Sequence, residues 1–109
     1  MINIILACQY GASTGMLCER IKIAAKETGE EAVVNAYSYT DIGSYIDSAD
    51  IVLLGPQVRF QLNQLSKKYA DKGVPFMVID TLAYGKMDGE KILKDAKSKV
   101  EEYQKETER

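Results

Sequence analysis

The chain has 109 residues and a mass of 12.1 kDa, enough for one hydrophobic core but too short for two ordinary domains, so we expect a single domain over residues 1–109. Hydrophobic residues make up 46% and charged residues 28%, which is typical of a globular protein. The net charge of -2 gives no electrostatic reason to expect a nucleic-acid or anionic-membrane partner. The chain has no histidine, which excludes imidazole bases, histidine metal ligands and a phosphohistidine of its own.

The two cysteines are Cys8 and Cys18. Their number and spacing suit neither a disulfide framework nor a zinc site, which predicts a reducing compartment. The apolar run near the N-terminus lacks a basic leader and is too short for a signal or membrane segment. We therefore expect a soluble, cytoplasmic protein that does not insert into a membrane.

Four short apolar runs alternate with helix-like segments, which predicts repeated β-α units around a parallel sheet. The runs are Ile2–Ala7, Ala32–Tyr37, Ile51–Leu54 and Phe76–Ile79. The first, third and fourth are almost continuously apolar, as in strands covered on both faces, whereas the second is more polar and suits an edge. Right-handed crossovers are satisfied most simply by the order 2-1-3-4. The predicted fold is α/β, a three-layer sandwich with a four-stranded parallel sheet.

Helices are expected between and after these strands. In the first, Leu17, Ile21, Ala24 and Thr28 recur at helical spacing before Gly29. Residues 41–48 suit only one or two irregular turns. The next helix is predicted to end near Gly73 and carries the stripe Val58, Leu62, Leu65 and Tyr69. The last carries Ile92, Leu93, Ala96, Val100 and Tyr103, and residues 84–88 are expected to form the loop before it, with Asp88 as its N-cap.

The segment CQYGASTG joins the end of the first strand to the start of the first helix. Its glycines permit tight turns, and its Ser-Thr pair suits a helix start. Backbone N–H groups and the positive end of the helix dipole then converge on one point, which predicts a phosphate site. The residues of this site are Gln9, Tyr10, Gly11, Ala12, Ser13, Thr14 and Gly15. The same geometry stabilises a thiolate, so Cys8 is expected to attack phosphorus and to form a phosphocysteine.

Other interpretations of this loop stay open. Cys8 would otherwise be a small buried residue at a strand end, although the glycines and the helix start favour the phosphate site. Cys18 lies inside the first helix, where packing explains it better than a redox role. A low-molecular-weight phosphatase uses a Cys-x5-Arg loop, but the corresponding residue here is Thr14, which disfavours hydrolysis by that mechanism. A phosphatase or arsenate-reductase-like enzyme and a non-catalytic anion-binding regulatory module are the alternatives.

Four motifs resemble those of enzyme IIB of the lactose/cellobiose/N,N'-diacetylchitobiose family of the bacterial sugar phosphotransferase system (PTS). They are ILACQYGASTG at the front, VLLGPQ at residues 52–57, VID at residues 78–80 and YGKMDG at residues 84–89. Each is modest alone, but four in this order along essentially the full chain are specific. The resemblance implies a parallel four-stranded sheet with a phosphatase-like cysteine P-loop that lacks the arginine. Tyr10 is bulkier than the small residue expected at its position.

The resemblance also implies a phosphoryl relay, the activity of a protein-phosphocysteine–sugar phosphotransferase. A phosphohistidine of a separate IIA protein donates to Cys8, and the phosphocysteine donates to a sugar bound by the IIC membrane permease. The absence of histidine here fits, because that histidine belongs to the partner. A standalone chain of this length resembles cellobiose or diacetylchitobiose members, which makes a β-glucoside of that type the expected sugar. We expect no metal or organic cofactor.

Four further residues are candidates for the wall of the loop or for partner docking. Gln57 and Arg59 follow the third strand, and Asp80 ends the fourth. Capping of the following turn explains Asp80 at least as well as a role as an acid, and a solvated helix position is the commoner role of an arginine such as Arg59. Tyr84 lies in the segment expected to be a loop.

Overall fold

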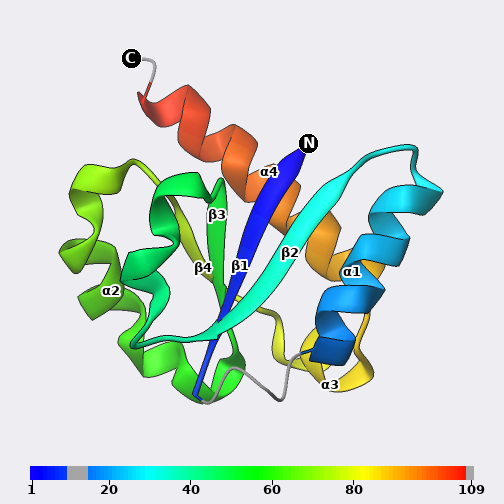
Figure 1. Cartoon of the computed structure of the whole chain (residues 1–109), viewed down its shortest axis with the longest axis horizontal. Coiled ribbons are helices and arrows are strands. Elements are labelled where there is room, and N and C mark those ends of the chain that lie inside the picture. Colours follow the sequence, from blue (N-terminus) through cyan, green and yellow to red (C-terminus); the bar gives the residue numbers. More distant parts are fainter. Residues whose placement is uncertain (10–14, 108–109) are drawn as a thin grey trace.

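The computed structural model describes residues 1–9 and 15–107. Four parallel strands form one sheet in the order β2-β1-β3-β4, which confirms the predicted order and the edge position of β2. The strands are β1 (Ile2–Cys8), β2 (Ala32–Ser38), β3 (Ile51–Leu54) and β4 (Phe76–Val78). Their apolar, β-branched composition suits a sheet that is covered on both faces. All four strands run toward the lower edge of the view in Figure 1.

Helices cover the two faces of the sheet and make the three predicted layers (Figure 1). One face is covered by α1 (Gly15–Glu27), α3 (Thr81–Lys86) and α4 (Gly89–Thr107), which form a core with the sheet around Ile4, Leu6 and Leu53. The other face is covered by the short turns η2 (Ile42–Ser44) and η3 (Ile46–Ser48), by η4 (Pro56–Gln61) and by α2 (Leu62–Lys68). No described helix is long and apolar enough to cross a membrane.

The predicted helix after β3 is broken into shorter pieces. The buried side chains Val58 and Leu65 lie in the core as the stripe predicts, but Val58 has non-helical backbone angles (φ -116°, ψ 21°), and η4 is a 3-10 segment. A hydrophobic stripe reports which residues face the core, and it does not distinguish i→i+3 from i→i+4 hydrogen bonding. The chain then passes through η5 (Ala70–Lys72) to Gly73, whose φ of 69° ends the segment as expected.

A second difference concerns the segment expected to be a loop before the last helix. Tyr84, Gly85 and Lys86 lie in the short helix α3, so the prediction of a loop over residues 84–88 was wrong for these three. Asp80 caps this helix by accepting a hydrogen bond from the backbone N–H of Ala83 at 3.0 Å. That cap stabilises the first turn and outweighs the low helix propensity of a glycine in the segment.

Candidate functional site

The end of β1 and the segments that follow β3 and β4 are held side by side at the carboxyl edge of the sheet. The strand register continues past the strands, because the backbone N–H of Gly55 donates to the carbonyl of Ala7 at 2.9 Å. The N–H of Ile79 likewise donates to the carbonyl of Leu54 at 2.9 Å. α1 and α2 leave this edge on opposite faces, as the two separate cores show. The strand order thus places a topological switch point between β1 and β3.

Cys8 is the last residue of β1 and is placed by the β1–β2 pairing. It lies opposite Ser38 in the register, and its carbonyl accepts from the N–H of Tyr39 at 2.8 Å. The Cys8 residue is 0% exposed, and its Sγ donates to the carbonyl oxygen of Tyr37 at 3.7 Å. The Cys8 side chain is thus held against the neighbouring strand β2.

Two residues at the ends of the predicted phosphate loop are described. Gln9 is exposed, and its carbonyl accepts a hydrogen bond from Ser38 Oγ at 3.2 Å. Gly15 is the first residue of α1, so the positive end of a thirteen-residue helix follows the cysteine segment. The intervening predicted residues, Tyr10, Gly11, Ala12, Ser13 and Thr14, lie outside the described residues.

Gln57 and Tyr84 are brought together by the fold. The Gln57 Nε2 donates to the Tyr84 hydroxyl oxygen at 3.0 Å, which joins the segment after β3 to α3. The Gln57 side chain also folds back over Gly55, where a Cβ would lie 2.6 Å from the Gln57 Oε1. Because Gly55 is hydrogen-bonded to Ala7, this bridge lies beside the end of β1. The sequence placed both residues at one edge but carried no signal for their contact.

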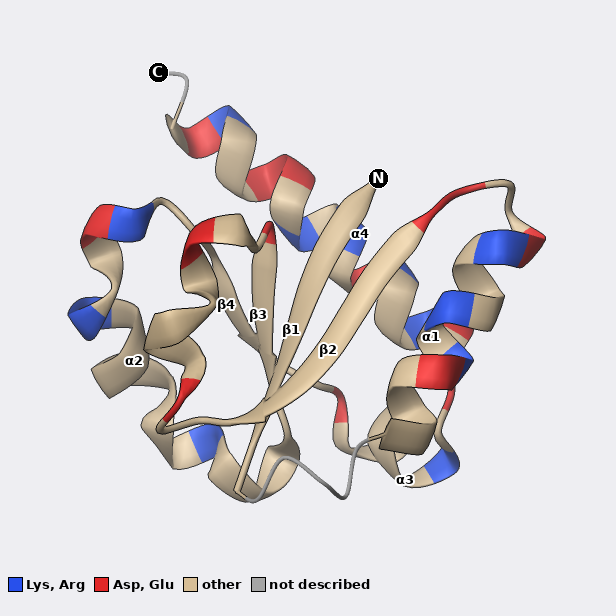
Figure 2. Ribbon diagram, viewed as in Figure 1, with Lys and Arg blue, Asp and Glu red and all other residues tan. Residues whose placement is uncertain are grey.

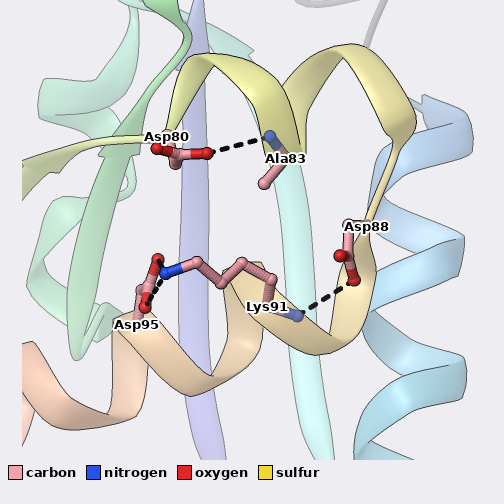
Figure 3. A network of polar contacts seen from close by, with 5 residues as sticks. All are labelled: Asp80, Ala83, Asp88, Lys91 and Asp95. Atoms are coloured by element: carbon pink, nitrogen blue, oxygen red, sulfur yellow. Dashed lines mark hydrogen bonds and ion pairs between the residues drawn. The ribbon is translucent and has the colours of Figure 1, made fainter.

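The carboxylates near α3 and α4 have structural partners (Figure 3). Asp80 caps α3 through Ala83, and Asp88 Oδ1 accepts from the backbone N–H of Lys91 at 3.1 Å, which confirms Asp88 as the cap of α4. Lys91 Nζ in turn binds both carboxylate oxygens of Asp95 at 2.9 Å. The pKa of the Lys91 ammonium is raised, and the largest cause is this hydrogen bond to Asp95. These local contacts stabilise the first turns of α3 and α4.

Two other candidates have local partners. The Arg59 Nη1 donates to the carbonyl of Pro56 at 3.0 Å, which ties the guanidinium to its own turn. Cys18 lies in the core between α1 and α4 and is 6% exposed. Burial raises the pKa of the Cys18 thiol and so favours its neutral form. Both observations fit Cys18 as a packing residue.

A family model described as "PTS system, Lactose/Cellobiose specific IIB subunit" matches residues 3–95. The chain is 38% identical over 98 residues to the oligo-beta-mannoside-specific EIIB component of Bacillus subtilis, covering 90% of this chain and 95% of that protein. It is 39% identical over 100 residues to the galactose-specific EIIB component of Lactococcus lactis subsp. cremoris. That match covers 87% of this chain and 93% of the relative. These two relatives are named for different sugars at nearly equal identity.

Two solved structures of IIB proteins have the same fold as this chain. The solution structure of the cellobiose-specific phosphotransferase IIB component from Borrelia burgdorferi superposes with a TM-score of 0.77 at 38% identity, over 94% of each chain. The lactose-specific IIB domain from Streptococcus pneumoniae has a TM-score of 0.80 at 17% identity, over 90% of this chain and 96% of that one, and so shares the fold. The chain therefore belongs to the lactose/cellobiose-specific IIB family of the PTS.

Proposed function

We propose that Cys8 is the phosphoryl carrier of this IIB chain. The observation that carries the proposal is its position: the cysteine ends the central strand β1, directly before the loop that leads into the start of α1. Family membership supports a phosphotransfer role, and the absence of histidine excludes a phosphohistidine on this chain. We expect residues 9–15 to bind the phosphoryl group.

The proposed relay has two substitution steps at phosphorus. In the first, Cys8 Sγ attacks a phosphohistidine of the IIA protein, the S–P bond forms and the N–P bond breaks, and the thiol proton passes to the departing imidazole nitrogen. In the second, a sugar hydroxyl oxygen bound by the IIC permease attacks the phosphocysteine. The O–P bond forms, the S–P bond breaks, and the hydroxyl proton returns to the thiolate. Both steps depend on positioning and charge stabilisation of the transferred group.

The burial of Cys8 supports transfer rather than hydrolysis. The sulfur is enclosed and donates to the Tyr37 carbonyl, so a bound partner, and not bulk water, reaches it when the site opens. Thr14 stands where a phosphatase carries its arginine, so the loop has no guanidinium to clamp a hydrolytic transition state.

The expected sugar is a β-glucoside of the cellobiose or chitobiose type, which the IIC permease selects.

The test is phosphorylation of the purified chain by a phosphorylated IIA protein. We expect one phosphate per wild-type chain, no label in Cys8→Ser, and normal labelling in Cys18→Ala, which removes the other thiol. Label that survives Cys8→Ser would refute the proposal. Sustained turnover of an aryl phosphate by the wild type would instead favour a phosphatase. Adding vesicles that contain the IIC permease should move the label to cellobiose or diacetylchitobiose, and to no sugar when Cys8 is replaced.

A further inference from the structure

The chain departs from strand geometry at Gln9, directly after the proposed carrier cysteine. The carbonyl of Ala7 accepts from the N–H of Gly55 on the β3 side at 2.9 Å, and the carbonyl of Cys8 accepts from the segment after β2 at 2.8 Å. A continued strand would direct the next carbonyl back toward β3, because successive carbonyls of a strand alternate in direction. The Gln9 carbonyl instead accepts from the Ser38 Oγ at 3.2 Å, again on the β2 side. This hydrogen bond therefore marks the point where the chain leaves the sheet.

The contact with Gln9 depends on a side chain, whereas two other contacts that tie this end of β1 to β2 are made to backbone groups. The Cys8 Sγ donates to the carbonyl of Tyr37 at 3.7 Å, and the Cys8 carbonyl accepts from the backbone N–H of Tyr39. Backbone donors and acceptors are present with almost any residue at these positions. The hydrogen bond to Gln9, in contrast, requires a hydroxyl group at residue 38.

Two hydroxyl groups act in series at this contact. A carbonyl oxygen can only accept, so the single hydroxyl proton of Ser38 is directed to Gln9. The Thr40 Oγ1 lies 2.9 Å from the Ser38 Oγ and is therefore the donor of that pair, and the backbone N–H of Thr40 also donates to the Ser38 Oγ at 3.4 Å. Donation to a hydroxyl oxygen polarises its O–H group and strengthens the bond that it donates. Thr40 thus acts on Gln9 through Ser38.

The turn that contains these hydroxyls has no basic residue. Its sequence from residue 38 is Ser-Tyr-Thr-Asp, and Figure 2 shows neither Lys nor Arg in this described segment between β2 and η2. The turn therefore offers no cation to attract a phosphoryl group on Cys8. Its contribution is one of position, because a peptide unit is planar and the direction of a carbonyl fixes the direction of the amide that follows it. The bond to Gln9 sets the direction in which the chain enters the predicted phosphate loop.

We propose that Ser38 is a positioning residue for phosphoryl transfer to Cys8. Its hydroxyl, supported by Thr40, fixes the carbonyl of Gln9 and thereby the start of the predicted phosphate loop. This inference rests on the proposed function, because a placed loop affects the reaction only if Cys8 is the carrier. The rate of transfer depends on how accurately the reacting groups are placed, so Ser38 acts on the maximal rate and not on the affinity for the donor.

The experiment measures the initial rate of Cys8 phosphorylation against the concentration of a purified phosphorylated IIA protein. Ser38→Ala removes the hydroxyl, and Ser38→Thr keeps a hydroxyl on a residue that suits a strand. Thr40→Ala is made alone and together with Ser38→Ala. Ser48→Ala is the matched control, because the Ser48 Oγ also donates to a backbone carbonyl, that of Tyr45 at 3.1 Å, but lies in η3 before β3 begins. Urea unfolding shows that each variant is folded.

We expect Ser38→Ala to lower the maximal rate about fivefold, the effect of one lost hydrogen bond of ordinary strength. The half-saturating donor concentration should stay within about twofold of wild type, because no contact with the donor is removed. Ser38→Thr should recover most of the rate, and Ser48→Ala should match wild type. Thr40→Ala should lower the rate less than Ser38→Ala does. Adding Thr40→Ala to Ser38→Ala should change nothing further, because Thr40 acts through Ser38.

A wild-type maximal rate in Ser38→Ala would overturn the inference, as would an equal loss in Ser48→Ala or a loss that Ser38→Thr fails to restore. A change in the half-saturating concentration alone would also overturn it, because Ser38 would then belong to a docking surface. Additive losses from Ser38→Ala and Thr40→Ala would contradict the action of the two hydroxyls in series. Each of these results can occur while Cys8→Ser abolishes the label, whereas label that survives Cys8→Ser refutes the proposed function itself.

Discussion

Gly89 is the position where α4 approaches α1 so closely that a side chain has no room. A Cβ at Gly89 would lie 2.4 Å from the carbonyl oxygen of Arg20, 2.6 Å from its carbonyl carbon and 2.9 Å from the N of Ile21. These are backbone atoms within α1, so no side chain can rotate away. Gly89→Ala therefore requires α4 to move away from α1 by roughly 1 Å, a gap that forfeits a quarter to a half of each dispersion contact across it.

The helices that would separate carry part of the main core, including Ile21, Ile92 and Leu93. We expect Gly89→Ala to lower the free energy of unfolding by about 2–3 kcal/mol, which corresponds to a fall in Tm of roughly 10 °C for a domain of this size. Urea unfolding followed by circular dichroism measures the change. A midpoint equal to that of wild type would refute the argument from close approach.

Gly85→Ala is the matched control for this prediction. Gly85 also lies in a helix, α3, but a Cβ there would meet nothing within 4 Å. Since alanine has the higher helix propensity, this variant should be as stable as wild type or up to about 1 kcal/mol more stable. If both substitutions lowered the free energy of unfolding equally, a general effect of replacing glycine, and not contact with α1, would explain the result.

Three further changes test other parts of the molecule. Asp80→Ala should cost about 1 kcal/mol of unfolding free energy because it removes the cap on Ala83 N–H, and Asp80→Asn should recover most of it in the same urea assay. Burial raises the pKa of the Cys18 thiol in the folded protein. The folded state is therefore stabilised by the neutral thiol at any pH below the unfolded pKa of about 8.5. This stabilisation is lost as the pH rises through the folded pKa. The difference in unfolding free energy between wild type and Cys18→Ala should therefore shrink as the pH rises above about 8.5, and a constant difference would contradict this assignment. Tyr84→Phe removes the hydroxyl that accepts from Gln57 at an exposed site, so stability should change by less than about 0.5 kcal/mol. Phosphoryl transfer to the chain should slow, and an unchanged rate would show that the bridge does not shape the site.

The strands of the sheet could be predicted because each one needs a particular local composition. A parallel strand covered on both faces must be almost wholly apolar, which marks Ile51–Leu54 without any knowledge of its neighbours. The right-handed crossover rule then leaves one simple order, and the structure has it. Three boundaries moved by one residue: β1 extends to Cys8, β2 extends to Ser38, and β4 ends at Val78.

The errors arise where one interaction outweighs local propensity. The helix α3 was missed because a glycine-containing motif is typical of a loop, whereas a single carboxylate cap at Asp80 is enough to start the helix. The Gln57–Tyr84 hydrogen bond was missed because it joins residues 27 positions apart. Contacts of this kind depend on the rotamers of two side chains and on the strand register, and neither leaves a periodic signal in the sequence.

The two cysteines show that burial alone does not separate a packing residue from a chemical one. Both are enclosed, but Cys18 lies in the core between α1 and α4, where apolar neighbours favour the neutral thiol and no partner protein can reach it. Cys8 lies at the carboxyl edge of the sheet, where its sulfur donates to a carbonyl of the neighbouring strand, and the segments after β2 and β3 are hydrogen-bonded to the end of β1. In the proposed function, the burial of Cys8 shields the carrier sulfur from water between transfers. We therefore expect enclosure of the Cys8 sulfur to limit hydrolysis of the proposed phosphocysteine, because bulk water does not reach the sulfur.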